Sequence, residues 1–150
     1  MSENSQVKSK KRVQEHGEVF TNEREVKAML DMVKDESERI DSRVLEPACG
    51  TGNFVVEILN RKLNTVKRKT TPKGRKKPFI ADYEKQSVLS VACIYGIDIM
   101  IDNVIECRDR LYNIWFETFK SDCKKTPDQN LCGAVKFILS AIFFVEIPSQ

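Results

Sequence analysis

The sequence is poor in metal-binding and disulfide-forming patterns. His16 is its only histidine, and its five cysteines are odd in number, far apart and never in a CxxC pair. A zinc site therefore has no visible ligand set, and a disulfide framework is not indicated. We expect no metal site, reduced and mostly buried cysteines, and a solvated His16.

Long apolar runs are also missing. The longest, Phe137 to Val145, is interrupted by Ser140 and is too short to cross a bilayer. Residues 1–12 are polar and basic, without the apolar segment of a secretory signal. We therefore expect a cytoplasmic protein that does not insert into membranes. Its 150 residues have the length of one domain, and a charged fraction of 31% is ordinary for a globular chain.

The positive charge is modest in total but unevenly distributed. The net charge is +3, yet residues 67–77 hold seven cations in a stretch that includes Pro72 and Gly74. These cations are Lys67, Arg68, Lys69, Lys73, Arg75, Lys76 and Lys77. A solvated flexible loop is the simpler interpretation. The alternative is a patch that contacts nucleic-acid phosphates, which would make binding salt-dependent.

Apolar periodicity predicts alternating strands and helices. Asn22, with Glu25 three residues later, resembles a capping box and predicts a helix from about Glu23 to Lys34. Further helices are expected at 54–63, 83–94, 101–119 and 131–139, strands at 43–47, 96–99 and 141–147, and a loop at 66–78. We divide the chain into a disordered basic arm (1–15), a helical segment (16–42) and an α/β domain (43–150).

The most specific motif is the segment 46–54 (EPACGTGNF). Gly50 and Gly52 permit backbone angles and close ligand approach that a side chain would block. The third glycine of a dinucleotide fingerprint would fall at Val55, so a pyrophosphate-binding turn is not specified. Glu46 suits a ligand with an ammonium group and would repel a pyrophosphate. S-adenosylmethionine fits this pattern better than NAD.

Three segments resemble the adenine-specific DNA methyltransferases of restriction–modification systems. Residues 16–21 (HGEVFT) look like the family's amino-terminal cofactor motif, which usually continues with proline where this chain has Asn22. Residues 46–54 match the family's glycine loop, and residues 95–99 (YGIDI) are similar to the strand whose acid binds the ribose. The resemblance therefore spans the chain from about Gly17 to Leu111.

This resemblance implies an incomplete Rossmann-like fold of parallel strands with flanking helices, preceded by a helical amino-terminal segment. It implies S-adenosylmethionine as cofactor, with Asp98 accepting hydrogen bonds from the ribose hydroxyls and Ile99 flanking the adenine. Phe20 and Thr21 would line the methionine end of the cofactor. Its amino-acid portion would be surrounded by the loop residues Glu46, Ala48, Gly50, Gly52 and Asn53.

Each of these roles has a structural alternative. Phe20 would serve equally as a core aromatic that packs on the following helix. Asp98 would serve as a helix cap, and Glu46 as a surface acid. Gly50 and Gly52 are hard to explain except by a turn with close backbone approach.

The family's catalytic segment is absent. Methyl transfer in the family uses an Asn/Asp/Ser-Pro-Pro-aromatic segment that holds the adenine amino group and stacks on the flipped base. No two of the five prolines are adjacent, so no catalytic residue is assigned and DNA methylation by this chain alone is not expected. Residues 141–148 (AIFFVEIP) also depart from the polar strand ending in Gly-Asp that the family usually has.

We therefore expect a truncated product. Loss of the later strands would leave Val44–Glu46 as an open sheet edge, where two copies, or a partner chain with the missing half, would pair. The alternative functions are a non-catalytic interaction subunit, a nucleotide-dependent oxidoreductase and a basic DNA-binding protein.

Overall fold

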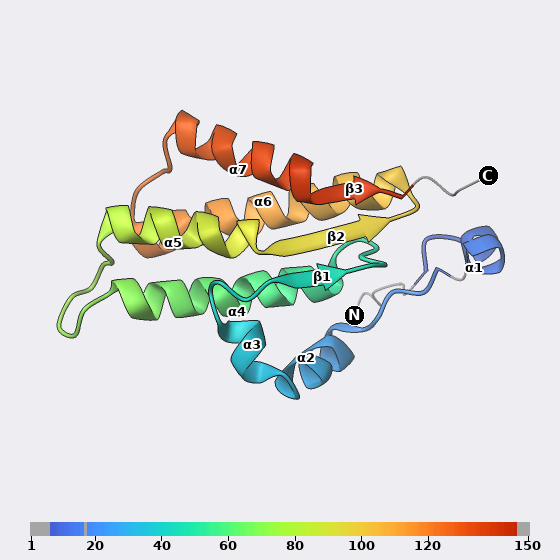
Figure 1. Ribbon diagram of the computed structural model, residues 1–150, viewed down its shortest axis with the longest axis horizontal. Coiled ribbons are helices and arrows are strands. Elements are labelled where there is room, and N and C mark those ends of the chain that lie inside the picture. Colours follow the sequence, from blue (N-terminus) through green and yellow to red (C-terminus); the bar gives the residue numbers. More distant parts are fainter. Residues whose placement is uncertain (1–6, 17, 147–150) are drawn as a thin grey trace.

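The computed structural model describes residues 7–16 and 18–146, which form a mixed α/β structure (Figure 1). Three helices precede the first strand: α1 (Lys10–His16), α2 (Glu23–Asp31) and α3 (Lys34–Glu38). Strands and pairs of helices then alternate: β1 (Val44–Glu46), α4 (Asn53–Thr70), α5 (Ile80–Ala92), β2 (Ile94–Asp98), α6 (Ile101–Cys123), α7 (Gln129–Ile142) and β3 (Phe143–Val145).

The three strands form one parallel sheet in the order β1-β2-β3. The register places Leu45 beside Tyr95 and Ile97 beside Phe144. Two helices connect each strand to the next, as parallel pairing requires a long crossover. The prediction of parallel strands with flanking helices is confirmed.

The two faces of the sheet differ in their cover. Helices α4 and α6 lie behind the strands in Figure 1, and on that side Ile94 and Phe143 are buried. Gly96 is required there, because a Cβ atom would collide with the Phe143 ring. No described helix crosses the opposite face, where Leu45 is 58% and Phe144 47% exposed.

The core lies among α4, α5 and α6 and includes several polar anchors. Trp115 is fully buried, and its indole N–H donates a hydrogen bond to Ser87 Oγ at 3.1 Å. Lys62 is also fully buried, and its ammonium group donates to Ile40 O (3.1 Å), Ser42 O (2.5 Å) and Ser42 Oγ (3.0 Å). This lysine thereby fixes the segment that leads into β1.

The amino-terminal helices share this core. Val26 and Leu30 of α2 and Ile40 after α3 belong to the same buried cluster as the residues of α4. A boundary between residues 42 and 43 therefore does not separate two hydrophobic cores.

Several predicted segments differ from the structure. The strand expected over 141–147 is shorter, Phe143–Val145, because α7 continues to Ile142, and residue 147 lies outside the described part. The arm over 1–15 was expected to be disordered, but α1 occupies Lys10–His16; residues 1–6 lie outside the described part. The helix expected over 23–34 ends at Asp31 and is followed by α3. The loop expected over 66–78 is wrong up to Thr70, because α4 continues to that residue and buries Val66 and Thr70.

Within residues 7–16 and 18–146, no helix has the length and apolar character needed to cross a bilayer. The same residues contain no group of three or more His, Cys, Asp or Glu arranged to hold a metal ion. All five cysteines are free, and four of them are buried.

Candidate functional site

A cavity of about 440 Å³ opens at the carboxyl ends of β1 and β2. Ligands of open parallel sheets bind at such strand ends, and the volume lies within the usual range for small-molecule sites, about 300–1,000 Å³. Most of the predicted cofactor residues line it, namely Phe20, Thr21, Glu46, Ala48, Gly50, Asn53, Asp98 and Ile99. Gly52 does not line the cavity.

The glycine turn between β1 and α4 has two residues with positive φ, 52° at Gly50 and 96° at Gly52. A Cβ atom at Gly52 would lie 2.6 Å from Cys107 Sγ, so this glycine allows the turn to pack on α6. A Cβ atom at Gly50 would lie 3.1 Å from the Phe20 ring. Gly52 therefore allows the turn to contact α6, whereas Gly50 forms part of the cavity wall.

Asp98 joins this turn to the end of β2. Its Oδ2 accepts a hydrogen bond from the Gly50 N–H at 2.9 Å, and its Oδ1 accepts from the Met100 N–H at 2.8 Å and Asn103 Nδ2 at 3.2 Å. Asp98 is not the N-cap residue of α6, which is Met100, but its carboxylate accepts from the Met100 N–H and therefore also stabilises the start of this helix, as the structural alternative expects. A carboxylate offers about four acceptor positions, which leaves one on Oδ2 for a ligand.

Phe20 and Thr21 form the wall opposite the strand ends. Phe20 lies against the glycine turn and is not a member of the buried core cluster, so the alternative of a core aromatic is wrong. The Thr21 carbonyl accepts a hydrogen bond from Asn53 Nδ2 at 2.9 Å. Arg110 holds the other side of Asn53, donating to its Oδ1 at 2.9 Å and to Thr51 O at 2.7 Å.

Glu18 and Asn103 line the cavity but had no role predicted from the sequence. Asn103 is 1% exposed, and its Nδ2 lies within hydrogen-bonding distance of both Glu18 Oε1 (2.7 Å) and Asp98 Oδ1 (3.2 Å). Glu18 lies inside residues 16–21, the segment that resembles the family's amino-terminal cofactor motif, so the sequence did contain an indication of its position. No sequence motif indicated Asn103, because its place in the cavity depends on how the first turn of α6 packs against the sheet.

The basic arm is fastened to the same place. Arg12 pairs with Glu18 Oε1 and Asp102 Oδ2, both at 2.6 Å, and Lys8 donates to Asn103 Oδ1 at 2.9 Å. The hydrogen bond from Arg12 is the main cause that lowers the pKa of Asp102 to about 2. These contacts attach the described part of the segment expected to be disordered, which begins at Val7, to the start of α6.

The cavity lining is acidic, and one of its carboxylates, Glu18, is paired with Arg12 outside the lining. The lining includes three carboxylates, Glu18, Glu46 and Asp98, and no lysine, arginine or histidine among the described residues. Burial raises the pKa of Glu46, opposed by a hydrogen bond from the Ala48 N–H at 3.3 Å, so Glu46 is more than a solvated surface acid. Such a lining attracts a cationic ligand and repels a phosphate.

The cationic segment lies far from this cavity. Helix α4 begins at the glycine turn and ends at the opposite end of the molecule, where residues 71–79 form the loop at the left of Figure 1. Lys67 is engaged in an ion pair with Asp122 at 2.7 Å. The structure therefore does not bring the predicted phosphate-contacting residues to the predicted cofactor residues.

The chain was compared with models of known protein families, with curated proteins and with solved structures, and none of the three comparisons gave a match.

Proposed function

We propose that the cavity binds S-adenosylmethionine and that this chain is the cofactor-binding part of an adenine-specific DNA methyltransferase with a Rossmann-like fold. The observation that carries the proposal is the charge of the lining. Three carboxylates and no lysine, arginine or histidine line the cavity beside the glycine turn, and Arg12 pairs with only one of the three, Glu18. S-adenosylmethionine is a nucleoside with a sulfonium and an ammonium group and without phosphate. Its charge complements this lining, whereas a pyrophosphate cofactor would be repelled.

The lining residues fit the parts of this ligand. The free acceptor position of Asp98 suits a ribose hydroxyl. Glu46 would face the ammonium group, and Phe20 and Ile99 supply apolar surface for the methionine chain and the adenine. Glu18 adds a further carboxylate to the wall formed by the arm.

The proposed function of these 150 residues is cofactor binding. The bound cofactor would supply an activated methyl group. Transfer of that group to adenine in DNA requires an Asn/Asp-Pro-Pro-aromatic segment, which the sequence does not contain. We therefore assign no catalytic residue.

A second candidate function is an interaction subunit, which the uncovered sheet face favours. Parallel sheets are usually covered on both faces, yet Leu45 and Phe144 are exposed on one face of this sheet. Strand β1 is also an edge strand. A second copy or a partner chain would cover this surface.

The experiment that tests cofactor binding is a titration of isotope-labelled protein with S-adenosylmethionine, followed by amide chemical shifts. We expect the amides of Ala48, Gly50 and Ile99 to shift in a saturable manner, because they line the cavity. The amide of Gly74, in the loop between α4 and α5 and so at the far end of α4 from the glycine turn, is the internal control and should not shift. Unchanged cavity amides at saturating ligand would refute the proposal.

A further inference from the structure

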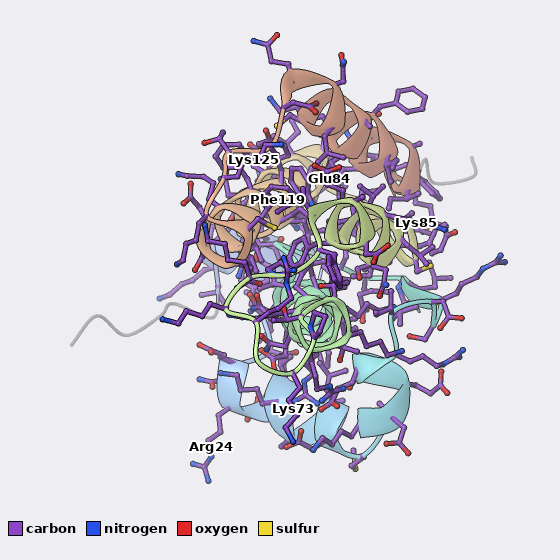
Figure 2. All side chains as sticks on the ribbon, turned by 90° about the vertical axis from the view of Figure 1, so that its left-hand side faces the viewer. Arg24, Lys73, Glu84, Lys85, Phe119 and Lys125 are labelled. Atoms are coloured by element: carbon purple, nitrogen blue, oxygen red, sulfur yellow. The ribbon has the colours of Figure 1, made fainter. Side chains whose placement is uncertain are left out.

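The end of the molecule opposite the cavity carries a second cluster of cations besides the segment 67–77. Lys124 and Lys125, just after α6, lie at the same end as the loop after α4, and Figure 2 shows this end with Lys73 and Lys125 labelled. We define the basic end as the exposed residues Arg68, Lys69, Lys73, Arg75, Lys76, Lys77, Lys124 and Lys125. Within the described chain, none of these eight side chains forms an ion pair.

The two cationic segments are joined through the buried side chain of Asp122. Asp122, on the last turn of α6, accepts a hydrogen bond from the Tyr83 hydroxyl at 2.9 Å and pairs with Lys67 at 2.7 Å. This arrangement ties α4, α5 and α6 to one another immediately beneath the surface. Lys67 is thus engaged in an ion pair within the protein. The remaining cations lie on helices and loops that these contacts hold together, so they form one surface.

Compensation of helix dipoles does not account for this charge. Helices α4 and α6 end here, and cations near their last turns are favourable. However, α5 and α7 begin at the same end, so their dipoles oppose those of α4 and α6. Lys73, Lys76 and Lys77 moreover lie beyond α4, outside its last turn.

Nearby acids do not neutralise the basic end. Asp122 is bonded to Lys67, and Glu117 pairs with Lys120 at 3.2 Å. Exposed Asp82 and Asp128 lie at the first turn of α5 and the N-cap of α7, where an acid interacts with its own helix. Glu84, also labelled in Figure 2, is a further acid at this end of the molecule. The eight cations still outnumber the acids that are not already paired.

The apolar groups at this end are few, which favours a nucleic acid over a membrane. Phe79 is the exposed aromatic of the loop, at 46%, and the Arg75 guanidinium covers its ring at 4.4 Å from the centroid. Membrane-surface segments need a broader apolar face for insertion. Clustered lysines and arginines without acidic partners instead suit the closely spaced phosphates of a nucleic-acid backbone.

We propose that the basic end binds the phosphate backbone of a nucleic acid, with residues 124–125 and 68–77 contributing to one surface, independently of the cavity. This inference rests on the DNA partner of the proposed function and extends it. The bound nucleic acid lies away from the cavity, so it is held by an anchoring contact and not by the site of methyl transfer.

The test measures anisotropy of a labelled DNA duplex of arbitrary sequence with the full chain at several NaCl concentrations. For the wild type we expect affinity to fall steeply with salt. The K124Q/K125Q variant should reduce the slope of log K against log salt by about 2, since each phosphate contact contributes about 1. The matched control, K10Q/K11Q, removes the same charge at the opposite end of the molecule, on α1, and should leave the slope unchanged.

The outcomes separate this inference from cofactor binding. Equal losses in both variants, or no salt-dependent duplex binding, would overturn it. Binding to phosphatidylserine vesicles but not to the duplex would assign the surface to membranes and also overturn it. Amide shifts on addition of S-adenosylmethionine should be the same in K124Q/K125Q as in the wild type, so a failure of the cofactor proposal is seen independently.

Discussion

The backbone N–H of Gly50 donates a hydrogen bond to Asp98 Oδ2 at 2.9 Å, joining a turn and a strand end that are 48 residues apart. A hydrogen bond from Cys49 N to Ile97 O, also 2.9 Å, continues the pairing of β1 and β2 to this point. The two motifs that the sequence linked only by resemblance thus form one side of a single cavity.

Replacing Gly52 with alanine should destabilise the protein by about 2–4 kcal/mol, because positive φ strain adds to a collision with Cys107. Urea unfolding monitored by circular dichroism measures the change. Gly74→Ala is the matched control, since Gly74 has a φ of 87° but nothing within 4 Å of an added Cβ. It should cost only about 1 kcal/mol. Equal losses at both positions would show that the contact with Cys107 is unimportant.

Removing the Asn103 amide should loosen the arm. Asn103→Ala deletes the groups bonded to Glu18, Asp98 and Lys8, and should cost about 2–3 kcal/mol because buried polar partners lose their bonds. Hydrogen exchange of residues 18–21 should accelerate in this variant. The exposed Asn113→Ala on the same helix should change neither quantity. Unchanged exchange in Asn103→Ala would contradict the role of this residue as an anchor.

Lys62→Met should destabilise the protein by about 2–4 kcal/mol, since the carbonyls of Ile40 and Ser42 lose their buried donor. The exposed Lys69→Met on the same helix is the control and should have little effect.

The pH dependence of stability provides a second test of Lys62. Burial lowers its pKa from 10.5 to about 8. Between these values the unfolded chain binds more protons than the folded chain, so the free energy of unfolding rises with pH. The wild type should therefore gain stability relative to Lys62→Met between pH 8 and 10.5 in urea titrations. If the difference in the free energy of unfolding between the wild type and Lys62→Met stays constant from pH 8 to 10.5, the buried amine does not titrate in this range.

The uncovered sheet face should mediate association. Light scattering at tens of micromolar should report a mass above that of one chain, and Leu45→Lys/Phe144→Lys should restore the monomer mass, because both side chains are exposed on this face. Met32→Lys, at another exposed apolar residue, is the control and should still associate. A monomeric wild type would exclude pairing of two copies through this surface.

Local patterns were sufficient to predict the framework of the site. The glycines, the apolar strand before them and the apolar strand ending at Asp98 each depend on a few neighbouring residues, and all three were located. The boundaries were less accurate. Proline and glycine at positions 72 and 74 suggested a loop from residue 66, whereas α4 continues to Thr70 with its last turns packed in the core.

Contacts between distant segments were not predictable from these patterns. The order of the arm depends on Asp102 and Glu106, about 90 residues from Arg12 and Lys8. Similarly, the basic end combines two segments that only the packing of α4 against α6 brings to one surface. Charge runs alone suggested a disordered arm in the first case and a solvated loop at residues 67–77 in the second.

The charge of the cavity is tested most directly by calorimetric titration of the full chain with S-adenosylmethionine and, separately, with NAD. We expect saturable heat with S-adenosylmethionine that is weakened in Glu46→Gln, because that variant removes one of the three lining carboxylates. We expect no binding of NAD, whose pyrophosphate the carboxylates repel. Heat with NAD alone would contradict the account and favour a nucleotide-dependent oxidoreductase.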